Sequence, residues 1–136
     1  SSDKFLYSNF KTVNNNEIIK IGDLQIKSIY TPGHYFDSIC YLLPTAIFTG
    51  DTLFVGRTGR VISAGSNIED LYLSVYGKIL QLPKHLRIYP GHHYGKQKSI
   101  TLEKNIRISP LLQAENFKDF LNRMDNYEKS RKSDSR

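Results

Sequence analysis

Three short segments that join glycine to a metal-ligating side chain constrain this chain most. Each follows a short apolar or β-branched run, so each is expected to begin where a strand ends. Two imidazoles and a carboxylate suit Zn²⁺ or non-haem Fe²⁺. An α/β fold whose strand ends present metal ligands is therefore expected. The three segments are Thr31-Pro32-Gly33-His34, Thr49-Gly50-Asp51-Thr52 and Tyr89-Pro90-Gly91-His92-His93-Tyr94.

The sequence before and between these segments predicts strands. Residues 17–21 and 24–30 carry alternating apolar and polar side chains around Gly22-Asp23, which predicts a hairpin. Residues 39–43 and 46–49 are near-continuous apolar runs, as expected for strands that are covered on both faces. A further short strand is expected at residues 87–89.

Helices are expected mainly in the second half of the chain. Asn67 can cap a helix whose first turn carries acidic residues, and Leu82-Pro83 ends this helix. Its apolar face is expected to comprise Leu71, Val75, Ile79 and Leu80. Further helices are expected over residues 99–107, from Pro110 onward, and over residues 116–129.

Length and charge limit the function classes. A chain of 136 residues fits one domain. The single cysteine, Cys40, excludes an internal disulfide and is expected to be a buried, inert thiol. Much of the net charge of +6 lies in residues 129–136, which are expected to form a basic flexible tail.

This charge pattern is not that of a nucleic-acid surface, because no basic stripe is interleaved with aromatic residues. No nucleic-acid partner is therefore expected. No apolar run is long enough to span a membrane and the first residues do not resemble a signal peptide, so no membrane partner is expected either. The expected location is the cytoplasm, or an organelle matrix if an upstream targeting segment has been removed.

Taken in order, the three segments resemble the metallo-β-lactamase superfamily, and within it glyoxalase II (hydroxyacylglutathione hydrolase) and persulfide dioxygenase. The resemblance extends through the turn Gly56-Arg57-Thr58-Gly59-Arg60 and covers roughly residues 17–125. It implies a four-layer αββα sandwich made of two similar halves. This chain is expected to supply only the C-terminal half, as one mixed sheet with covering helices.

The superfamily's His-x-His-x-Asp-His motif does not occur in this sequence, and no histidine precedes His34. The resemblance implies that His34 completes one metal site, that Asp51 bridges two ions and that His92 binds the second ion. Residues 1–16 are expected to be a linker or the remnant of an upstream segment, and residues 17–128 the C-terminal part of the domain. A missing N-terminal half or a homodimer mate is expected to complete it.

The resemblance also implies an activity. It is that of a metal-dependent hydrolase in which hydroxide at a two-zinc site attacks a thiolester or related acyl substrate, such as a glutathione-linked one. Asp51 is the expected catalytic residue, and Arg60 and Tyr94 are the expected substrate-binding pair. Thr58 stands where a cysteine is common in the thiolester hydrolases, which argues against glutathione.

Two alternatives stay open. The first is a persulfide dioxygenase-like oxygenase that uses a single iron ion, with His34 and Asp51 among its ligands. The second is a non-catalytic half that binds a partner through its open sheet. His93 and His85 are not expected to bind metal in any of these cases.

Overall fold

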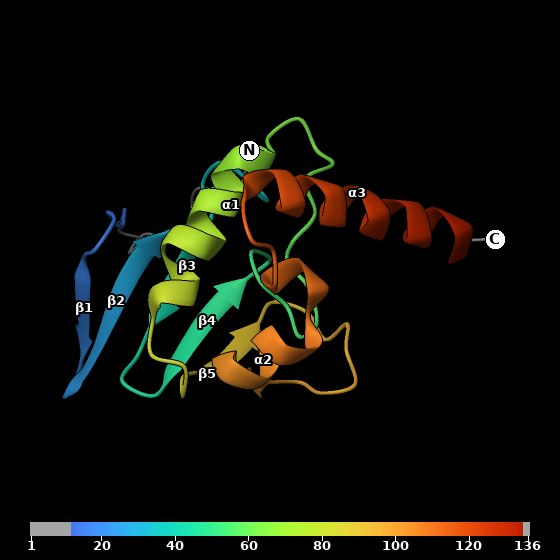
Figure 1. The fold of residues 1–136 in the computed structure, drawn as a ribbon. Coiled ribbons are helices and arrows are strands. Elements are labelled where there is room, and N and C mark those ends of the chain that lie inside the picture. The colour runs from blue at the N-terminus through green and yellow to red at the C-terminus, as the bar shows by residue number, and fades with distance from the viewer. Residues whose placement is uncertain (1–11, 135–136) are drawn as a thin grey trace, which may run out of the picture.

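The computed structural model describes residues 12–134, and its centre is one six-stranded mixed sheet. The strands follow one another across the sheet in chain order, and all neighbours are antiparallel except β4 and β5, which are parallel (Figure 1). The α/β fold with one mixed sheet is confirmed. The strands are β1 (Ile18–Ile21), β2 (Leu24–Tyr30), β3 (Ile39–Leu42), β4 (Ala46–Gly50), β5 (Arg87–Pro90) and β6 (Ile100–Thr101).

Helices cover one face of this sheet (Figure 1). Helix α1 lies across the middle strands, α2 lies beside β5, and α3 begins next to α1 and runs outward away from the sheet. The core between the two layers includes Ile47, Ile88, Leu71 and Phe120, all fully buried. The helical elements are α1 (Ile68–Gly77), η2 (Ile79–Gln81), α2 (Leu102–Ile108), η3 (Pro110–Leu112) and α3 (Phe117–Asp134). No helix within residues 12–134 is both long and apolar enough to cross a lipid bilayer.

The expectation that the strands at residues 39–43 and 46–49 are covered on both faces is wrong for β4, and the neighbouring β5 shows the same exposure on one face. In β4, Ile47 is fully buried whereas its neighbour Phe48 is 44% exposed. In β5, Ile88 is fully buried whereas Tyr89 is 41% exposed. Side chains alternate along a strand, so the helices cover only the face of Ile47 and Ile88. The opposite face is apolar and open.

Helix α1 begins where the sequence predicts. The Asn67 side chain accepts a hydrogen bond from the Asp70 backbone N–H at 2.9 Å, as an N-cap does. The predicted helix is interrupted at Gly77, and the shorter element η2 follows it. The interruption still keeps Ile79 in the core beside Val75 and Leu71.

The predicted helix over residues 99–107 begins only at Leu102. Residues Ile100 and Thr101 instead pair with β5, and Thr101 accepts a hydrogen bond from the Lys104 backbone N–H at 3.3 Å. Thr101 is therefore both the last strand residue and the helix cap.

Both ends of the described chain differ from expectation. Helix α3 continues through Asp134, so residues 129–134 of the predicted flexible tail are helical, and Lys129 pairs with Asp125 one turn earlier at 2.8 Å. Within the predicted linker 1–16, the Asn15 side chain accepts a hydrogen bond from the Tyr30 backbone N–H at 2.8 Å. Residues 12–16 thus adjoin the sheet, while residues 1–11 and 135–136 lie outside the described residues.

Candidate metal centre

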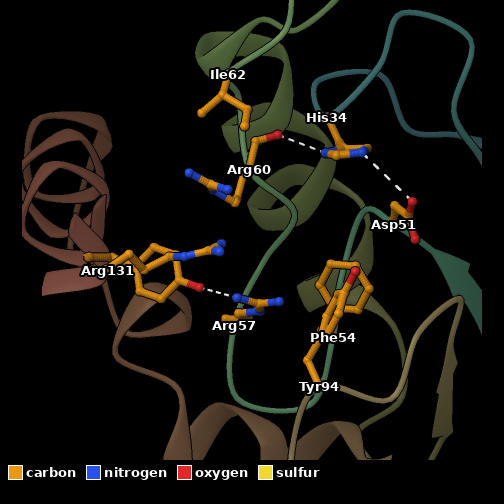
Figure 2. A pocket seen from close by; sticks show the side chains of 9 residues that line it. His34, Asp51, Phe54, Arg57, Arg60, Ile62, Tyr94 and Arg131 are labelled. Atoms are coloured by element: carbon orange, nitrogen blue, oxygen red, sulfur yellow. Dashed lines mark hydrogen bonds and ion pairs between the residues drawn. The ribbon is translucent and has the colours of Figure 1, made fainter. Parts of the chain in front are cut away.

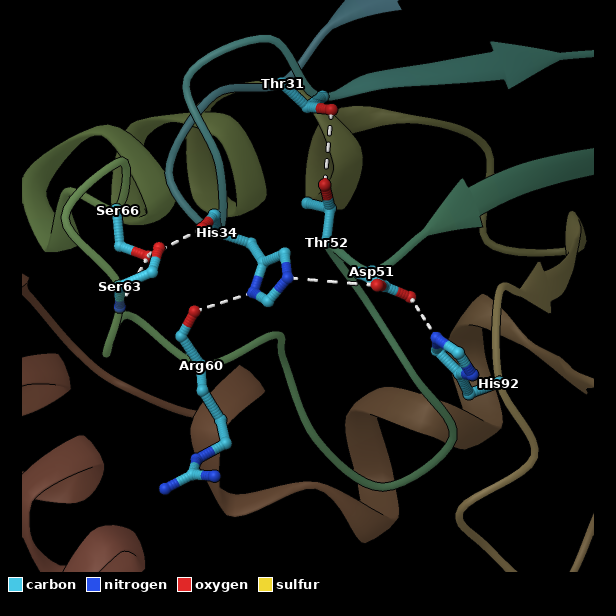
Figure 3. A network of polar contacts seen from close by, with 8 residues as sticks. All are labelled: Thr31, His34, Asp51, Thr52, Arg60, Ser63, Ser66 and His92. Carbon is cyan, nitrogen blue, oxygen red and sulfur yellow. Dashed lines mark hydrogen bonds and ion pairs between the residues drawn. The ribbon is translucent and has the colours of Figure 1, made fainter. Parts of the chain in front are cut away.

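The structure brings His34, Asp51 and His92 together, as the sequence predicts (Figure 3). Asp51 directly follows β4, His92 follows β5, and His34 lies in the loop after β2. The Nε2 atom of His34 lies 3.8 Å from Asp51 Oδ2, and the Nε2 atom of His92 lies 3.2 Å from Asp51 Oδ1. One carboxylate therefore presents a separate oxygen to each imidazole.

Glycines allow the backbone of these loops to approach so closely. A Cβ atom at Gly91 would lie 2.8 Å from the Asp51 carboxylate, and one at Gly59 would lie 2.0 Å from the Asp51 carbonyl oxygen. Gly33 has φ +144°, and a Cβ there would lie 2.3 Å from the Leu71 backbone. Gly33, Gly59 and Gly91 are thus required by close packing around Asp51 and α1.

A second hydrogen bond orients His34. Its Nδ1 atom lies 2.7 Å from the Arg60 carbonyl oxygen (Figure 3). Because a carbonyl oxygen can only accept, Nδ1 carries the proton, and in the neutral ring the lone pair lies on Nε2, toward Asp51. Metal-bound histidines are commonly held in this way by a backbone carbonyl.

Ring contacts hold His92 instead. Its imidazole is stacked on the Tyr94 ring, with centroids 5.2 Å apart and planes 23° apart, and it also contacts Phe54. The His92 side chain is 53% exposed and that of Asp51 is 39% exposed. An ion could therefore reach both from solvent.

The donor atoms fit zinc, but only as two partial sites. Each would receive one imidazole nitrogen and one carboxylate oxygen, whereas zinc takes four ligands, at least three of them from protein in most sites. Among residues 12–134, no three His, Cys, Asp or Glu side chains lie close enough together to hold one ion. Among the described residues, His85 and His93 are both exposed, and neither forms an ion pair with Asp51.

A cavity of about 630 Å³ opens beside Asp51 (Figure 2). Its wall near the candidate metal centre consists of His34 and Asp51, and Phe54 continues the wall away from them. Three arginines and two tyrosines form most of the remaining lining, together with Ile62. These are Arg57, Arg60, Arg131, Tyr94 and Tyr127.

The sequence model of the metallo-beta-lactamase superfamily matches residues 7–92, more than half of the chain. The chain belongs to the metallo-β-lactamase superfamily. It is 36% identical over 123 residues to the probable polyketide biosynthesis zinc-dependent hydrolase BaeB of Bacillus velezensis, covering 88% of this chain and 55% of the relative. It is 37% identical over 114 residues to a hydroxyacylglutathione hydrolase of Dictyostelium discoideum, covering 78% and 39% of the two chains.

Solved structures of the superfamily share the fold. ETHE1 from Myxococcus xanthus superposes with a TM-score of 0.78 at 32% identity, over 85% of this chain and 51% of that one. The chain spans about half the length of these superfamily relatives, or less.

Arg60 and Tyr94, the predicted substrate-binding pair, have different surroundings in the structure. Both residues line the cavity. The Arg60 guanidinium, however, makes a bidentate ion pair with Glu128, with N–O distances of 2.8 and 2.7 Å. This hydrogen bond with Glu128 raises the pKa of Arg60 above its usual value. Tyr94 has no such partner and contacts the Arg57 guanidinium with its ring face, 4.4 Å from the ring centroid.

Sequence reasoning did not assign Arg57, Tyr127 or Arg131 to the site. Arg57 stands in the glycine turn three residues before Arg60, which was a usable signal. Tyr127 and Arg131 carry no such signal, because the sequence predicts a packing face around Tyr127 and a flexible tail around Arg131. Only the length and direction of α3 bring them to the cavity.

Cys40 is fully buried beneath the candidate metal centre. Burial raises the pKa of its thiol to about 11, and the thiol contacts the Thr31 hydroxyl at 3.3 Å. Thr31 in turn lies 3.4 Å from the hydroxyl of Thr52, the residue after Asp51. The prediction of a buried thiol is confirmed, and its raised pKa makes the thiolate scarce at neutral pH.

Proposed function

We propose that this chain supplies part of the active site of a metal-dependent thioester hydrolase. Asp51 would bridge two zinc ions, His34 would bind one of them and His92 the other. The observation that carries this proposal is that two imidazole Nε2 atoms face different oxygens of one carboxylate. Two relatives, a probable zinc-dependent hydrolase and a hydroxyacylglutathione hydrolase, support the metal and the substrate class.

When bound, zinc lowers the pKa of a coordinated water molecule and places positive charge beside a carbonyl oxygen. The chain's own residues would position the reactants. The Arg60 carbonyl holds His34 in the tautomer that can bind metal. Phe54 and Tyr94, in edge-to-face contact at 5.0 Å, form an apolar wall along which a thioester chain could lie next to Asp51.

The domain boundaries form part of the same proposal. Residues 17–128 would be the C-terminal part of the metallo-β-lactamase domain, and the missing ligands would come from a segment or second chain seated on the open sheet face. The exposed aromatic side chains of that face support this arrangement, because apolar area gains stability when it is covered.

The proposal is tested by zinc-dependent hydrolysis of a hydroxyacylglutathione thioester, measured as thiol release, with the missing part of the domain supplied together with this chain. Asp51→Asn should abolish zinc-dependent turnover, because amide oxygen is a poor bridge between two cations. Asp70→Asn, which removes an exposed carboxylate from the first turn of α1, is the matched control and should retain it. Equal turnover in these two variants would refute the role of Asp51.

One observation favours a single-iron oxygenase as the second candidate. His34 is oriented by a hydrogen bond at 2.7 Å, whereas no hydrogen bond to His92 Nδ1 occurs among the described residues. His34 and Asp51 could thus serve one ion without His92. Oxygen uptake with a persulfide in the iron-loaded protein, unaffected by His92→Ala, would support this candidate over the hydrolase.

A further inference from the structure

We propose that Arg57 and Arg131 form an anion-binding subsite in the cavity beside Asp51. It would bind the carboxylate or phosphate group at the far end of a thioester substrate's thiol portion, so the proposal rests on the proposed function. Arg60, the arginine that the sequence singled out, is occupied by Glu128 and would serve the fold instead.

Aromatic side chains fix the Arg57 guanidinium in place. Its central carbon lies 4.4 Å from the Tyr94 ring centroid and 5.3 Å from that of Phe54, and Nη1 donates a hydrogen bond to the Tyr127 hydroxyl. A guanidinium held over aromatic rings keeps its charge and its planar fork available to an anion. An arginine fixed in this way loses little conformational freedom when a ligand binds.

Arg57 also has an unsatisfied donor. Its Nε atom is buried without a hydrogen-bond partner. Buried donors are nearly always paired in native proteins, so an unpaired one indicates a missing partner. An acceptor oxygen entering the cavity would provide that partner.

Arg131 adds a second positive charge from another element. It reaches the same cavity from α3, as Figure 2 shows. No carboxylate in the described part of the chain forms an ion pair with Arg57 or Arg131, whereas Arg60 is paired with Glu128. The positive charge opposite the candidate metal centre is therefore not neutralised within the described protein.

The shape of the cavity matches an elongated substrate. In Figure 2, Asp51 and His34 line one side of the cavity, Phe54 and Tyr94 lie next to them, and Arg57 and Arg131 lie toward the other side. A thioester carbonyl next to Asp51 would direct its thiol portion along the aromatic wall toward the arginines. Glutathione ends in carboxylates and phosphopantetheine in a phosphate, and both offer the bidentate acceptor that a guanidinium binds best.

Calorimetric binding of matched probes to the full chain tests the subsite. The S-methyl thioether of pantetheine 4′-phosphate is compared with that of pantetheine, and S-methylglutathione with its diethyl ester. Thioethers are used because a free thiol would itself bind metal. We expect at least one anionic probe to bind about tenfold more tightly than its neutral counterpart. The pair with the larger ratio identifies phosphate or carboxylate as the ligand.

Variants assign this preference to residues. Arg57→Gln and Arg131→Gln should each reduce it several-fold, whereas Arg107→Gln, which removes an exposed arginine on α2 paired only with Glu103, should leave it unchanged. The readout is binding and not turnover, so a failed hydrolase assay does not affect this result. Thermal melting checks that each variant is folded. Arg131 lies near the end of α3, so Arg131→Gln keeps the test valid if Arg57→Gln does not fold.

Two results would overturn the proposal. One is that neither anionic probe binds better than its neutral counterpart. The other is that the arginine variants in the cavity behave like Arg107→Gln.

Discussion

Next to the candidate metal centre, the backbone at Gly33 has no room for a side chain. Its φ is +144°, and an added Cβ would lie 2.3 Å from the backbone of Leu71 in α1. Gly33→Ala should therefore lower the free energy of unfolding by roughly 3 kcal/mol, since backbone strain and a clash with a helix backbone act together. Urea unfolding followed by circular dichroism measures the change.

The control for this prediction is Gly77→Ala, at the last residue of α1. Nothing lies within 4 Å of a Cβ there, so the free energy of unfolding should stay the same or rise by about 0.5 kcal/mol. Similar losses in both variants would mean that the close approach of Gly33 to α1 is not a constraint.

The Cys40 thiol predicts a pH dependence of stability. Burial raises its pKa from 9.0 to about 11, so the folded state holds the thiol proton more tightly than the unfolded state does. The stabilisation is complete below about pH 9 and is lost as the pH rises through 11, by about 3 kcal/mol in all.

Urea unfolding at pH 8 and pH 10.5 checks this prediction when the protein is compared with Cys40→Ala. The variant lacks the titrating thiol, and the other alkaline groups are common to both proteins. The stability difference between the two should shrink at the higher pH. A difference that is constant with pH would contradict the raised pKa.

At this scale the sequence predicted which candidate ligands lie together, but not which groups surround them. His34, Asp51 and His92 could be found because glycine and a ligand-type residue recur at strand ends. The partner of His34 Nδ1 is a backbone carbonyl 26 residues away in the chain, at Arg60. Backbone carbonyls carry no side-chain signal, so only the folded loop reveals this contact.

At the scale of elements, α3 is joined to the glycine turn by polar contacts. Arg60 pairs with Glu128, and both side chains are less than one-third exposed. Glu128→Gln should lower the free energy of unfolding by about 1 kcal/mol, because it leaves the Arg60 charge without its carboxylate in a partly buried place. Urea unfolding measures this loss.

The exposed pair of Glu103 and Arg107 on α2 is the matched control for Glu128→Gln. Both side chains are more than half exposed, so Glu103→Gln should change the free energy of unfolding by less than about 0.5 kcal/mol. Equal effects of the two substitutions would mean that the Arg60 pair does not fasten α3 to the turn.

Strands and the cap of α1 could be predicted from local patterns, whereas the end of α3 and the short strand β6 could not. The polar, basic sequence of residues 129–136 resembles a flexible tail, yet Lys129 and Asp125 pair along one helix face. Ile100 and Thr101 form a strand because β5 lies next to them. Tertiary pairing of this kind overrides local sequence preference.

At the scale of the whole molecule, the open sheet face is the most unusual feature. Phe48 and Tyr89 lie on it with ring centroids 5.7 Å apart. The full chain should self-associate through this face when nothing else covers it, and the double substitution Phe48→Lys and Tyr89→Lys should weaken that association. Sedimentation velocity at several concentrations measures it.

Leu73→Lys is the control for the sheet face, because Leu73 is also apolar and 56% exposed but lies on α1. It should leave self-association unchanged. If the unsubstituted chain is monomeric at every concentration, or if all variants associate equally, the face does not act as an interface between copies.

Zinc binding tests the central claim most directly. This claim is that Asp51 holds metal together with both His34 and His92. Elemental mass spectrometry after equilibrium dialysis would give the zinc bound per chain in the unsubstituted protein, in Asp51→Asn and in Asp70→Asn. We predict about one or more zinc ions per chain in the unsubstituted protein and in Asp70→Asn, with loss of zinc in Asp51→Asn. Equal zinc content in all three proteins, or none in the unsubstituted one, would contradict the claim.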